Sequence, residues 1–405
     1  MSTTVSQKDH WREVYRRQRL KNAFLWLDEL ERTSDPAALA AANYDKLLQS
    51  LEQTLKYEDT FSVGCDLLRE ITPIAFAMAD WGRLRIYLKE ALSKIKSLSN
   101  RSYEAYLLEW IADIEASLVN LSEAEKNFHS ALQLYLEEGE TVRYGRILPR
   151  LARLYASQGK ISKALELSND ALKLGEKENE SIIIADALFS LAEIHVRSID
   201  WQKALDYSAL ATSKYKEIGK QSFIIRVGSV SVACKASLER YDEAKAEADY
   251  LLQICNSSEN AYDNLYSIIH LRRSIGYMAF IQNDYLAAER HWHEAYRETT
   301  KIGAQDLSAS IGVNLAKVYT VWGEYETAEQ MMFEALAFFD GLGDVARWAN
   351  NMDNLVDVYE KKGDWEACKH TLERAIARLE PEATTSYSLE LLQEMQQRLE
   401  NLPKI

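Results

Sequence analysis

The chain has 405 residues, of which 47% are hydrophobic, so it is long enough to bury a sizeable core. It carries 48 Lys and Arg against 62 Asp and Glu, and this net charge of −14 argues against general nucleic-acid binding, which depends on neutralising phosphates. Only 5 prolines and 15 glycines occur, a composition typical of a chain that is helical almost throughout.

The N-terminal sequence MSTTVSQKDHWREVYRR lacks the apolar segment of a signal peptide, and the longest apolar stretches, such as residues 71–79, are too short to span a bilayer. The four cysteines stand at 65, 234, 255 and 368, without a CxxC pair or metal-ligand spacing. These features predict a reduced, cytoplasmic protein without a membrane span.

Residues 8–57 are predicted to form two helices that are broken at TSDP, residues 33–36. The segment WREVYRRQRLK, residues 11–21, is basic and amphipathic. Trp11, Val14 and Tyr15 are expected to face a partner or the first repeat. The basic residues of this segment, Arg12, Arg16, Arg17, Arg19 and Lys21, are expected to stay in water. A helix lying on a membrane surface is the alternative interpretation.

From residue 80 onward, a small or apolar marker residue recurs with a period of about 40. The markers are Leu84, Ala124, Ala164, Ala204, Ala244, Ala288, Ala328 and Ala367, at intervals of 40, 40, 40, 40, 44, 40 and 39. Large apolar residues precede them at Trp81, Leu121, Ile161, Trp201, Tyr241, Tyr285, Tyr325 and Trp365. Small residues precede them at Ala112, Ala152, Ala192, Gly276 and Ala316, where two helices are expected to approach closely. A fixed period of this length is typical of stacked helical hairpins.

Residues that tolerate a left-handed conformation divide each repeat into two helices. Gly159, Asn283, Gly323 and Gly363 are expected to end first helices, and Gly139, Asn179, Gly219, Gly303 and Gly343 to end second helices. The extra residues of the 44-residue repeat are expected in a polar loop at residues 255–264.

The segment from Leu148 to Leu165 resembles the tetratricopeptide repeat, a 34-residue helix-turn-helix unit, and residues 314–336 match its pattern as well. The period of about 40 is similar to the long-helix subclass in kinesin light chain and in bacterial peptide-sensing regulators. The resemblance covers roughly residues 65–380. It implies an all-α fold, a right-handed superhelical solenoid of eight to nine hairpins whose first helices line a concave groove.

The two ends of the chain are predicted to differ from the repeats. Residues 385–402 place Tyr387, Leu391, Leu392, Met395, Leu399 and Leu402 on one side of an amphipathic helix, which would cap the last repeat. We therefore expect N-terminal helices over residues 1–62, with a degenerate first repeat as one interpretation. Eight repeats are expected over residues 63–380, and a capping helix over residues 381–405.

Four arginines, Arg143, Arg146, Arg150 and Arg153, share one face of a predicted helix, because they are spaced by 3, 4 and 3 residues. The resemblance places Arg146, Arg150 and Arg153 in the groove, where guanidinium groups suit carboxylate or phosphate ligands. It implies an arrangement similar to the carboxylate clamp of chaperone-binding domains, with Arg69 replacing a lysine, but Pro73 and Trp110 stand where that clamp has asparagines.

The alternative for this row is a structural ladder of ion pairs with Glu109, Asp113, Asp186 and Glu193 on adjacent repeats. Pro149 lies within the same helix, and we expect it to kink the helix because it leaves the Gly145 carbonyl without its usual donor.

A second candidate binding cluster consists of His270, Arg273, Tyr277 and Phe280, which with Arg272 mixes basic and aromatic groups as peptide-binding surfaces do. Ordinary packing of the two aromatic rings is the alternative. The HWH motif at residues 291–293 is not expected to bind metal, because histidines two apart point to different sides of a helix. We identify no catalytic, cofactor-binding or metal-binding motif.

These observations predict a non-enzymatic scaffold that binds a partner protein, or an acidic or C-terminal peptide segment, in its groove and regulates a separate effector. The alternatives are a regulator that changes superhelical shape when it binds a signal peptide, an RNA-binding protein and an enzyme. Self-association through the terminal faces is left open.

Overall fold

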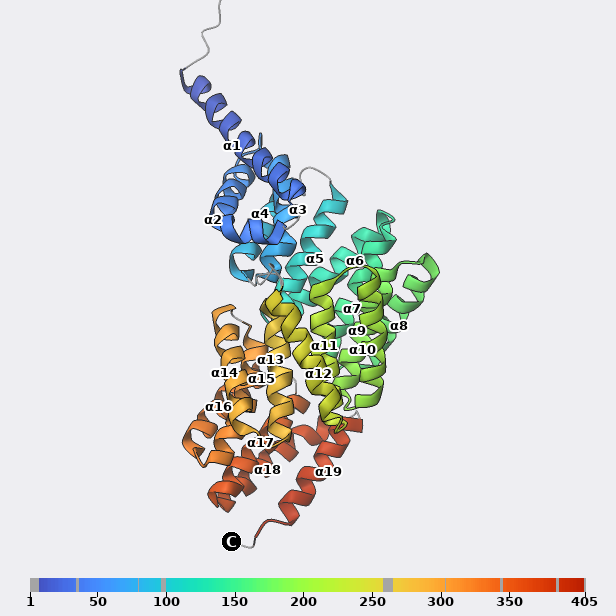
Figure 1. Ribbon diagram of the computed structural model, residues 1–405, viewed down its shortest axis with the longest axis vertical. Helices are drawn as coiled ribbons and strands as arrows, with labels where there is room; N and C mark the ends of the chain where they lie inside the picture. The colour runs from blue at the N-terminus through green and yellow to red at the C-terminus, as the bar shows by residue number, and fades with distance from the viewer. Residues whose placement is uncertain are drawn as a thin grey trace, which may run out of the picture. The chain divides into compact units, whose positions relative to one another are not determined.

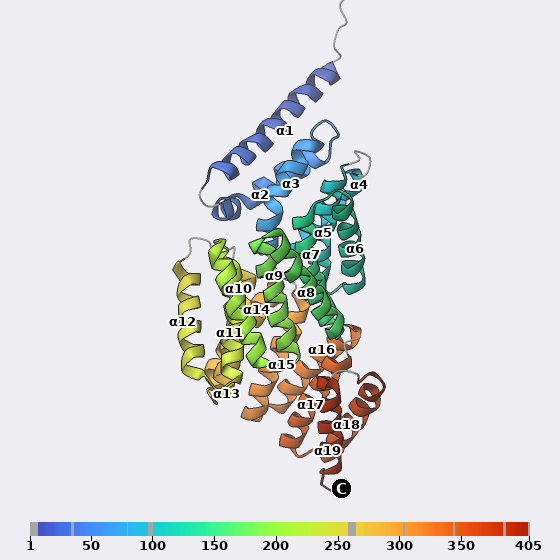
Figure 2. The ribbon, with the colours of Figure 1, turned by 90° about the vertical axis from the view of Figure 1, so that its right-hand side faces the viewer.

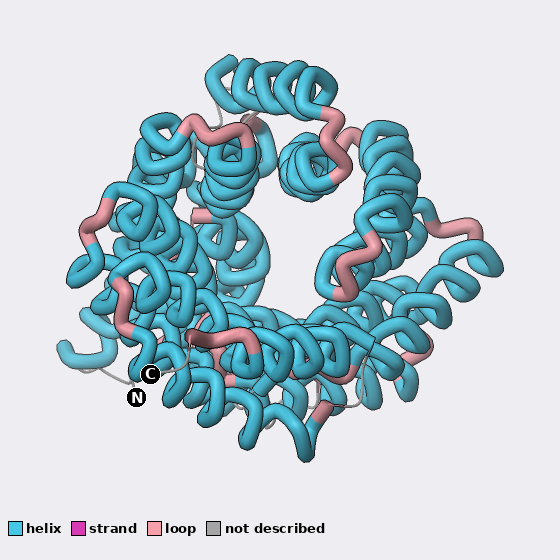
Figure 3. The backbone as a smooth tube through the Cα atoms, turned by 90° about the horizontal axis from the view of Figure 1, so that it is seen from below, coloured by secondary structure: helices cyan, strands magenta, loops and turns pink. Residues whose placement is uncertain are grey.

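The computed structural model describes residues 7–33, 36–78, 80–95, 100–257, 265–302, 304–342, 345–383 and 386–403. Within these ranges the chain consists of helices joined by short turns, without a β-strand (Figure 1; Figure 3). The helices are α1 (Gln7–Arg32), α2 (Pro36–Leu55), α3 (Phe61–Ala77), α4 (Trp81–Ile95), α5 (Arg101–Ser117), α6 (Leu121–Glu137), α7 (Thr141–Ser157), α8 (Ile161–Glu178), α9 (Ser181–Arg197), α10 (Trp201–Glu217), α11 (Gln221–Ser237), α12 (Tyr241–Ser257), α13 (Leu265–Ile281), α14 (Tyr285–Ile302), α15 (Gln305–Trp322), α16 (Tyr325–Leu342), α17 (Val345–Lys362), α18 (Trp365–Leu379), the 3-10 helix η2 (Glu380–Glu382) and α19 (Ser386–Glu400). The all-α prediction is confirmed.

The chain forms two compact units. Unit 1 consists of Met1–Ile114, Lys126–Gly139 and Ile254–Tyr266, and unit 2 of Glu115–Glu125, Glu140–Gln253 and Ser267–Ile405. In unit 1, α3 packs closely on α2, and two tyrosines of α5 donate hydrogen bonds to carbonyls of α3. The Tyr103 hydroxyl lies 2.8 Å from the Cys65 oxygen, and the Tyr106 hydroxyl lies 3.1 Å from the Arg69 oxygen.

The predicted repeats correspond to eight helical hairpins within the described residues, from α3/α4 to α17/α18. Each second helix begins at the predicted large apolar residue: Trp81, Leu121, Ile161, Trp201, Tyr241, Tyr285, Tyr325 and Trp365. The seven markers from Leu84 to Ala328 are at most 1% exposed, and each lies about one turn after the start of its second helix. The predicted domain boundaries at 62/63 and 380/381 fall inside α3 and η2.

The last marker, Ala367, was assigned wrongly. Cys368 is fully buried and follows Trp365 by three residues, as the other markers follow their large apolar residues, whereas Ala367 is partly exposed. The true interval is therefore 40, from Ala328 to Cys368. An alanine stands beside the correct position, so groove positions counted back from Ala367 are shifted by one residue, whereas Trp365 and Gly363 were predicted correctly.

The turn inside each hairpin from α5/α6 onward contains a residue with positive φ, five positions before the marker. Gly159, Gly323 and Gly363 have φ of 75°, 80° and 79°, and Asn283 has 64°, as predicted. Val119, Ile199 and Glu239 occupy the same position with φ of 66°, 57° and 59°. Gly139, Asn179 and Gly219 end second helices with positive φ as predicted, whereas Gly303, Gly343 and most of the loop at 255–264 lie outside the described residues.

Replacing Ile199 by glycine is expected to raise the free energy of unfolding by roughly 0.5–1 kcal/mol, because a β-branched residue is strained in the left-handed region. The Ile199 side chain is exposed, so little packing is lost. Gly159→Ala should have the opposite effect of similar size, since an added Cβ meets no atom within 4 Å and the cost is conformational. Thermal or urea unfolding measures both changes. Equal stability of the two variants would contradict the left-handed conformation of Ile199 and Gly159.

The helices predicted at the two ends of the chain are present, but not every side of them faces the expected way. The break at TSDP separates α1 from α2, and Leu391, Leu392 and Met395 of α19 are buried against α17 and α18, with Tyr387, Leu399 and Leu402 partly buried there. For α1, the expectation that every basic residue stays in water was wrong for Arg19. Of the two contacts expected for Trp11, Val14 and Tyr15, the first repeat is excluded and a partner stays a prediction. Trp11, Val14 and Tyr15 are exposed, while Arg19 is 13% exposed and faces its own unit.

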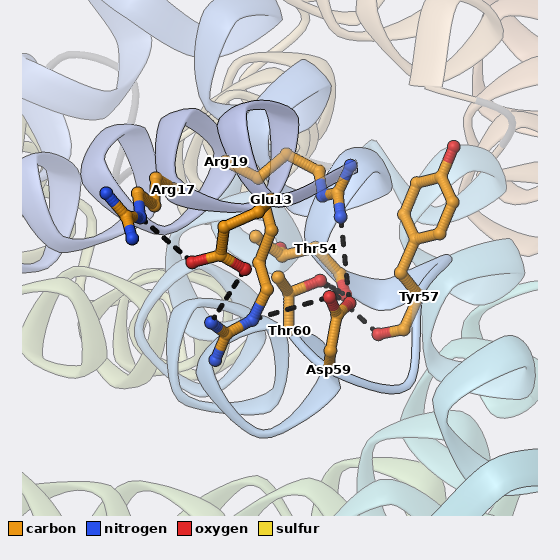
Figure 4. Close-up of polar contacts among 8 residues, drawn as sticks. Glu13, Arg17, Arg19, Thr54, Tyr57, Asp59 and Thr60 are labelled. Atoms are coloured by element: carbon orange, nitrogen blue, oxygen red, sulfur yellow. Dashed lines mark hydrogen bonds and ion pairs between the residues drawn. The ribbon is translucent and has the colours of Figure 1, made fainter. Parts of the chain in front are cut away.

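An aspartate in the turn between α2 and α3 explains this orientation (Figure 4). Asp59 lies 3.4 Å from Nε of Arg16 and 3.6 Å from Nη2 of Arg19. The Arg19 guanidinium also stacks over the Tyr57 ring at 4.0 Å. The Thr60 hydroxyl, which donates to the Thr54 carbonyl at 2.9 Å, fixes this turn. Specific charge partners thus place the arginine side of α1 inward.

Candidate functional site

The candidate site is a face shared by the first helices of successive hairpins in unit 2. There, α7 lies beside α9, α9 beside α11, and α15 beside α17. We call it the first-helix face and define it by the residues that stand 18, 15, 14, 11 and 8 positions before each marker. In α7 these residues are Arg146, Pro149, Arg150, Arg153 and Ala156.

Ion pairs link this face from one hairpin to the next. Nε of Arg146 lies 3.3 Å from Oδ2 of Asp186, and Nε of Arg153 lies 3.3 Å from Oε2 of Glu193. The other oxygen of Glu193 lies 3.6 Å from Nη2 of Arg226 on α11. We call these five residues the arginine ladder. Arg146 and Arg153 therefore form ion pairs with acids of the next repeat, which is the structural alternative that the sequence left open.

The ladder leaves parts of its arginines in water. The side chains of Arg146 and Arg153 are 33% and 25% exposed. The guanidinium carbons of Arg153 and Arg226 lie 5.8 Å and 5.1 Å from the centre of the Phe189 ring, which stands between them. The Phe189 ring itself is only 1% exposed, so a ligand on this face can contact the guanidinium groups, which the buried ring supports from below.

Asp186 anchors the ladder to the interior. It is buried, and its Oδ1 accepts a hydrogen bond of 2.6 Å from the hydroxyl of Tyr215, which is fully buried on α10. Burial and the neighbouring Asp186 carboxylate raise the pKa of Tyr215 well above its ordinary value. A similar pair in unit 1 joins the Tyr135 hydroxyl to Glu109 at 2.7 Å, so Glu109 is held by a tyrosine.

The remaining residues of the arginine row have different surroundings. Arg143 pairs with Glu140 at 3.1 Å, next to the start of its own helix, and Arg150 is partly buried. Pro149 is buried within α7, which is one helix from Thr141 to Ser157. Its carbonyl accepts a hydrogen bond of 3.1 Å from the Ser190 hydroxyl of α9. A kink at Pro149 stays a prediction.

The second predicted cluster, on α13, divides into packing and charged residues. The Phe280 ring packs 5.6 Å from the Trp292 ring, and the Tyr277 hydroxyl shares a hydrogen bond of 3.2 Å with Ser237. Phe280 thus packs within its own hairpin, and Tyr277 joins α13 to α11 by a hydrogen bond. His270 is partly buried; its burial, and the charges of Arg273 and Arg226, lower its pKa well below the ordinary value, so it is neutral at pH 7.

Arg273 faces a carboxylate that the sequence did not single out. Asp306, at the start of α15, accepts from Nη1 of Arg347 on α17 at 2.5 Å. Burial raises the pKa of Asp306, but the guanidinium groups of Arg347, Arg197 and Arg273 outweigh it and hold that pKa below its ordinary value. Arginines from three other helices thus gather around one acid.

A second group that the sequence did not reveal lies at the last hairpin. Arg398 of α19 is within 2.8 Å of Asp353, 2.8 Å of Asp357 and 2.9 Å of Glu360. With Cys368 as the marker, these acids stand 15, 11 and 8 positions before it, which are positions of the first-helix face. The wrong marker hid this alignment. An open pocket of about 610 Å³ lies here, lined by Trp365, Glu394 and Gln397 among others.

Among the described residues, no group of three or more His, Cys, Asp or Glu side chains is arranged to hold a metal ion. His291 and His293 flank the buried Trp292 and differ in exposure, as expected for opposite sides of α14. No helix in the described part of the chain is long and apolar enough to cross a membrane.

Comparison with solved structures identifies similar folds at low sequence identity. A Rap protein complexed with Competence and Sporulation Factor has a TM-score of 0.60 and 14% identity, and the match covers 95% of this chain and 99% of that one. A STAND signal transduction ATPase with a tetratricopeptide repeat sensor, from Pyrococcus horikoshii, has a TM-score of 0.51 and 14% identity, with coverages of 95% and 55%. Aspartyl phosphate phosphatase F from Bacillus subtilis has a TM-score of 0.50 and 12% identity, with coverages of 93% and 96%.

No protein-family model and no curated protein sequence matches the chain. The structural likeness, together with the hairpin register, shows the class of fold: this is a tetratricopeptide-type helical-repeat protein. The resemblance drawn from the repeated residues is thereby confirmed at the level of the fold, and function has to be argued from the site.

Proposed function

We propose that the chain is a non-catalytic scaffold that binds a segment of a partner protein on the first-helix face of unit 2. The acidic side chains or the C-terminal carboxylate of that segment contact Arg146, Arg150 and Arg153. The partner in turn acts on, or is itself, a separately encoded effector. This proposal extends the general use of helical-repeat surfaces for protein recognition to this chain.

The observation that supports it most directly is the arrangement of Arg146, Arg153, Arg226 and Phe189. Asp186 and Glu193 hold three partly exposed guanidinium groups in fixed positions, and those of Arg153 and Arg226 lie over the buried Phe189 ring. Fixed side chains lose less conformational entropy on binding than free ones. Carboxylates accept paired hydrogen bonds from guanidinium groups, so an acidic segment fits this face better than a neutral one.

The test is capture of partners from native cell lysate with wild type and with Arg146→Glu/Arg150→Glu, followed by titration of the purified partner. We expect the double variant to bind at least tenfold more weakly, roughly 1.4 kcal/mol or more, and to show a shallower salt dependence. Because Arg146→Glu places a carboxylate beside Asp186, thermal unfolding accompanies the titration, and Arg150→Glu alone serves as the milder variant.

Lys173→Glu/Lys177→Glu is the matched control, since it changes the charge equally on α8, where both side chains are 77% exposed. Wild-type affinity in the folded arginine variants, or equal weakening by the control, would reject the first-helix face as the binding surface. The row would then be a structural ladder only.

A second candidate is a sensor that binds a short signal peptide and changes shape. The observation in its favour is the Rap protein solved with Competence and Sporulation Factor, whose fold matches almost the whole length of both chains. The two candidates differ in what suffices for binding. A short peptide that binds as tightly as the folded partner, and changes the radius of gyration in solution scattering, supports the sensor. A folded partner that binds without such a change supports the scaffold.

A further inference from the structure

Helix α1 docks on unit 1 through one side and leaves a different side exposed. The docked side contains Ala23 and Leu30, both buried, and the two arginines that contact Asp59. In both views the N-terminal half of α1 extends beyond α2, α3 and α4 (Figure 1; Figure 2). The helix is therefore held on one side from Arg16 to Leu30, and its N-terminal part and its other side are exposed to solvent.

The exposed side carries four large apolar residues at helical spacing. Trp11, Val14, Tyr15 and Leu25 are 51%, 39%, 61% and 51% exposed. Their positions, i, i+3, i+4 and i+14, fall on one face. The rings of Trp11 and Tyr15 lie 6.3 Å apart. Single exposed apolar residues are common on proteins, but an aligned set on an anchored helix indicates a contact surface. We call these four residues the α1 strip.

The charge around the α1 strip is opposite to that of the whole chain. Residues 10–21 contain Arg12, Arg16, Arg17, Arg19 and Lys21 against the single acid Glu13, in a chain with a net charge of −14. Asp59 contacts Arg16 and Arg19, whereas Lys21 is exposed and Arg17, which pairs with Glu13 at 2.9 Å, is still 78% exposed. Trp, Tyr and Arg are the residues that most often dominate binding energy at protein interfaces.

Two features argue against other ligands. Gln18 and Asn22 lie within the α1 strip and share a hydrogen bond of 2.8 Å, so insertion into lipid would desolvate an amide pair. Val14 and Leu25 have no ring on which a base could stack, and the net charge opposes a nucleic acid.

We propose that the α1 strip is a docking surface for a partner protein that presents an apolar pocket bordered by carboxylates. Trp11 and Tyr15 fill the pocket, and Arg17 and Lys21 face the carboxylates. This surface belongs to unit 1 and uses none of the residues of the first-helix face, so it stands independently of the function proposed above.

The test begins with a photo-cross-linking residue, p-benzoylphenylalanine, in place of Tyr15 in the full chain in its native cells. The adduct is identified, and a protein found in it is purified and titrated against wild type, Trp11→Ser/Tyr15→Ser and Arg17→Glu/Lys21→Glu. We expect the first pair to weaken binding more than about tenfold, and the second to weaken it and reduce its salt dependence. The side chains are exposed, so unfolding temperatures should stay unchanged.

The controls are Leu286→Ser, a residue of α14 that is 73% exposed, and Lys173→Glu/Lys177→Glu on α8. Both should bind the partner like wild type. The proposal is overturned by the absence of a protein adduct, by a partner whose contact surface is basic, or by unchanged affinity in the strip variants. It is likewise overturned if the strip variants abolish binding to vesicles with 30% phosphatidylglycerol or to a single-stranded oligonucleotide.

Discussion

Gly276→Ala is expected to lower the free energy of unfolding by about 2 kcal/mol, although alanine favours helices more than glycine does by roughly 1 kcal/mol. A Cβ at this position of α13 would lie 2.4 Å from Nε1 and 2.5 Å from Cδ1 of Trp292. That indole is almost fully buried, and its Nε1 donates to the Arg273 carbonyl at 2.9 Å. The ring cannot move away without losing this hydrogen bond and its contact with Phe280.

Two other helical glycines provide controls for Gly276→Ala in urea unfolding. An added Cβ at Gly82 meets nothing within 4 Å, so Gly82→Ala should be neutral or stabilising by roughly 0.5 kcal/mol. A Cβ at Gly145 would meet the flexible end of Ile183, at 2.6 Å from Cδ1, so Gly145→Ala should have an intermediate effect. If Gly276→Ala were as stable as Gly82→Ala, the close packing of Gly276 of α13 against Trp292 of α14 would be contradicted.

Asp186→Ala is expected to destabilise the chain by about 2–3 kcal/mol. The main reason is the buried Tyr215 hydroxyl, which loses its acceptor at 2.6 Å. The Arg146 ion pair contributes less, because that arginine is partly exposed and its charge is screened by water. Asp186→Asn keeps an acceptor of similar shape, so it should cost roughly 1 kcal/mol.

The contribution of the hydrogen bond can be isolated with Tyr215→Phe and the double variant Asp186→Ala/Tyr215→Phe. The double variant should be less destabilised than the sum of the single variants, because neither polar group is then left buried alone. Glu109→Ala in unit 1 tests the same effect at a second site, since the hydroxyl of the fully buried Tyr135 donates a hydrogen bond of 2.7 Å to Glu109. If the changes in unfolding free energy of the single variants simply added up in the double variants at both sites, the tyrosine and carboxylate of each pair would not be energetically coupled.

Much of the fold could be predicted because it depends on local signals that repeat. The starts of the second helices, from Trp81 to Trp365, and the left-handed turns at Gly159 and Gly323 follow from periodicity and backbone preference. Ile199 shows the limit of this reasoning. Its side chain disfavours the left-handed region, yet the hairpin imposes that conformation because the adjacent helices fix where the turn must lie.

The candidate site was predictable only in part. The alignment of Arg146, Arg150 and Arg153 follows from helix geometry, but their partners had to be chosen among 62 acidic residues. Asp186 and Glu193 were considered as partners, whereas Arg226, Asp306 and the contacts of Arg398 were not anticipated. A one-residue error at Ala367 was enough to hide the acids that contact Arg398, since each step along a helix turns the side chain by about 100°.

By itself, the sequence determined the class of the protein, the division into helices, and the register of the hairpins up to the last one. These follow from the repeat period and from the buried small residues, because every hairpin must cover the next to exclude water. Only the tertiary structure decided which side of α1 docks and which carboxylate each arginine meets. Apolar and charged residues occur on both sides of that helix, so the geometry of the α2–α3 turn, with Asp59 placed opposite Arg16 and Arg19, selects between them.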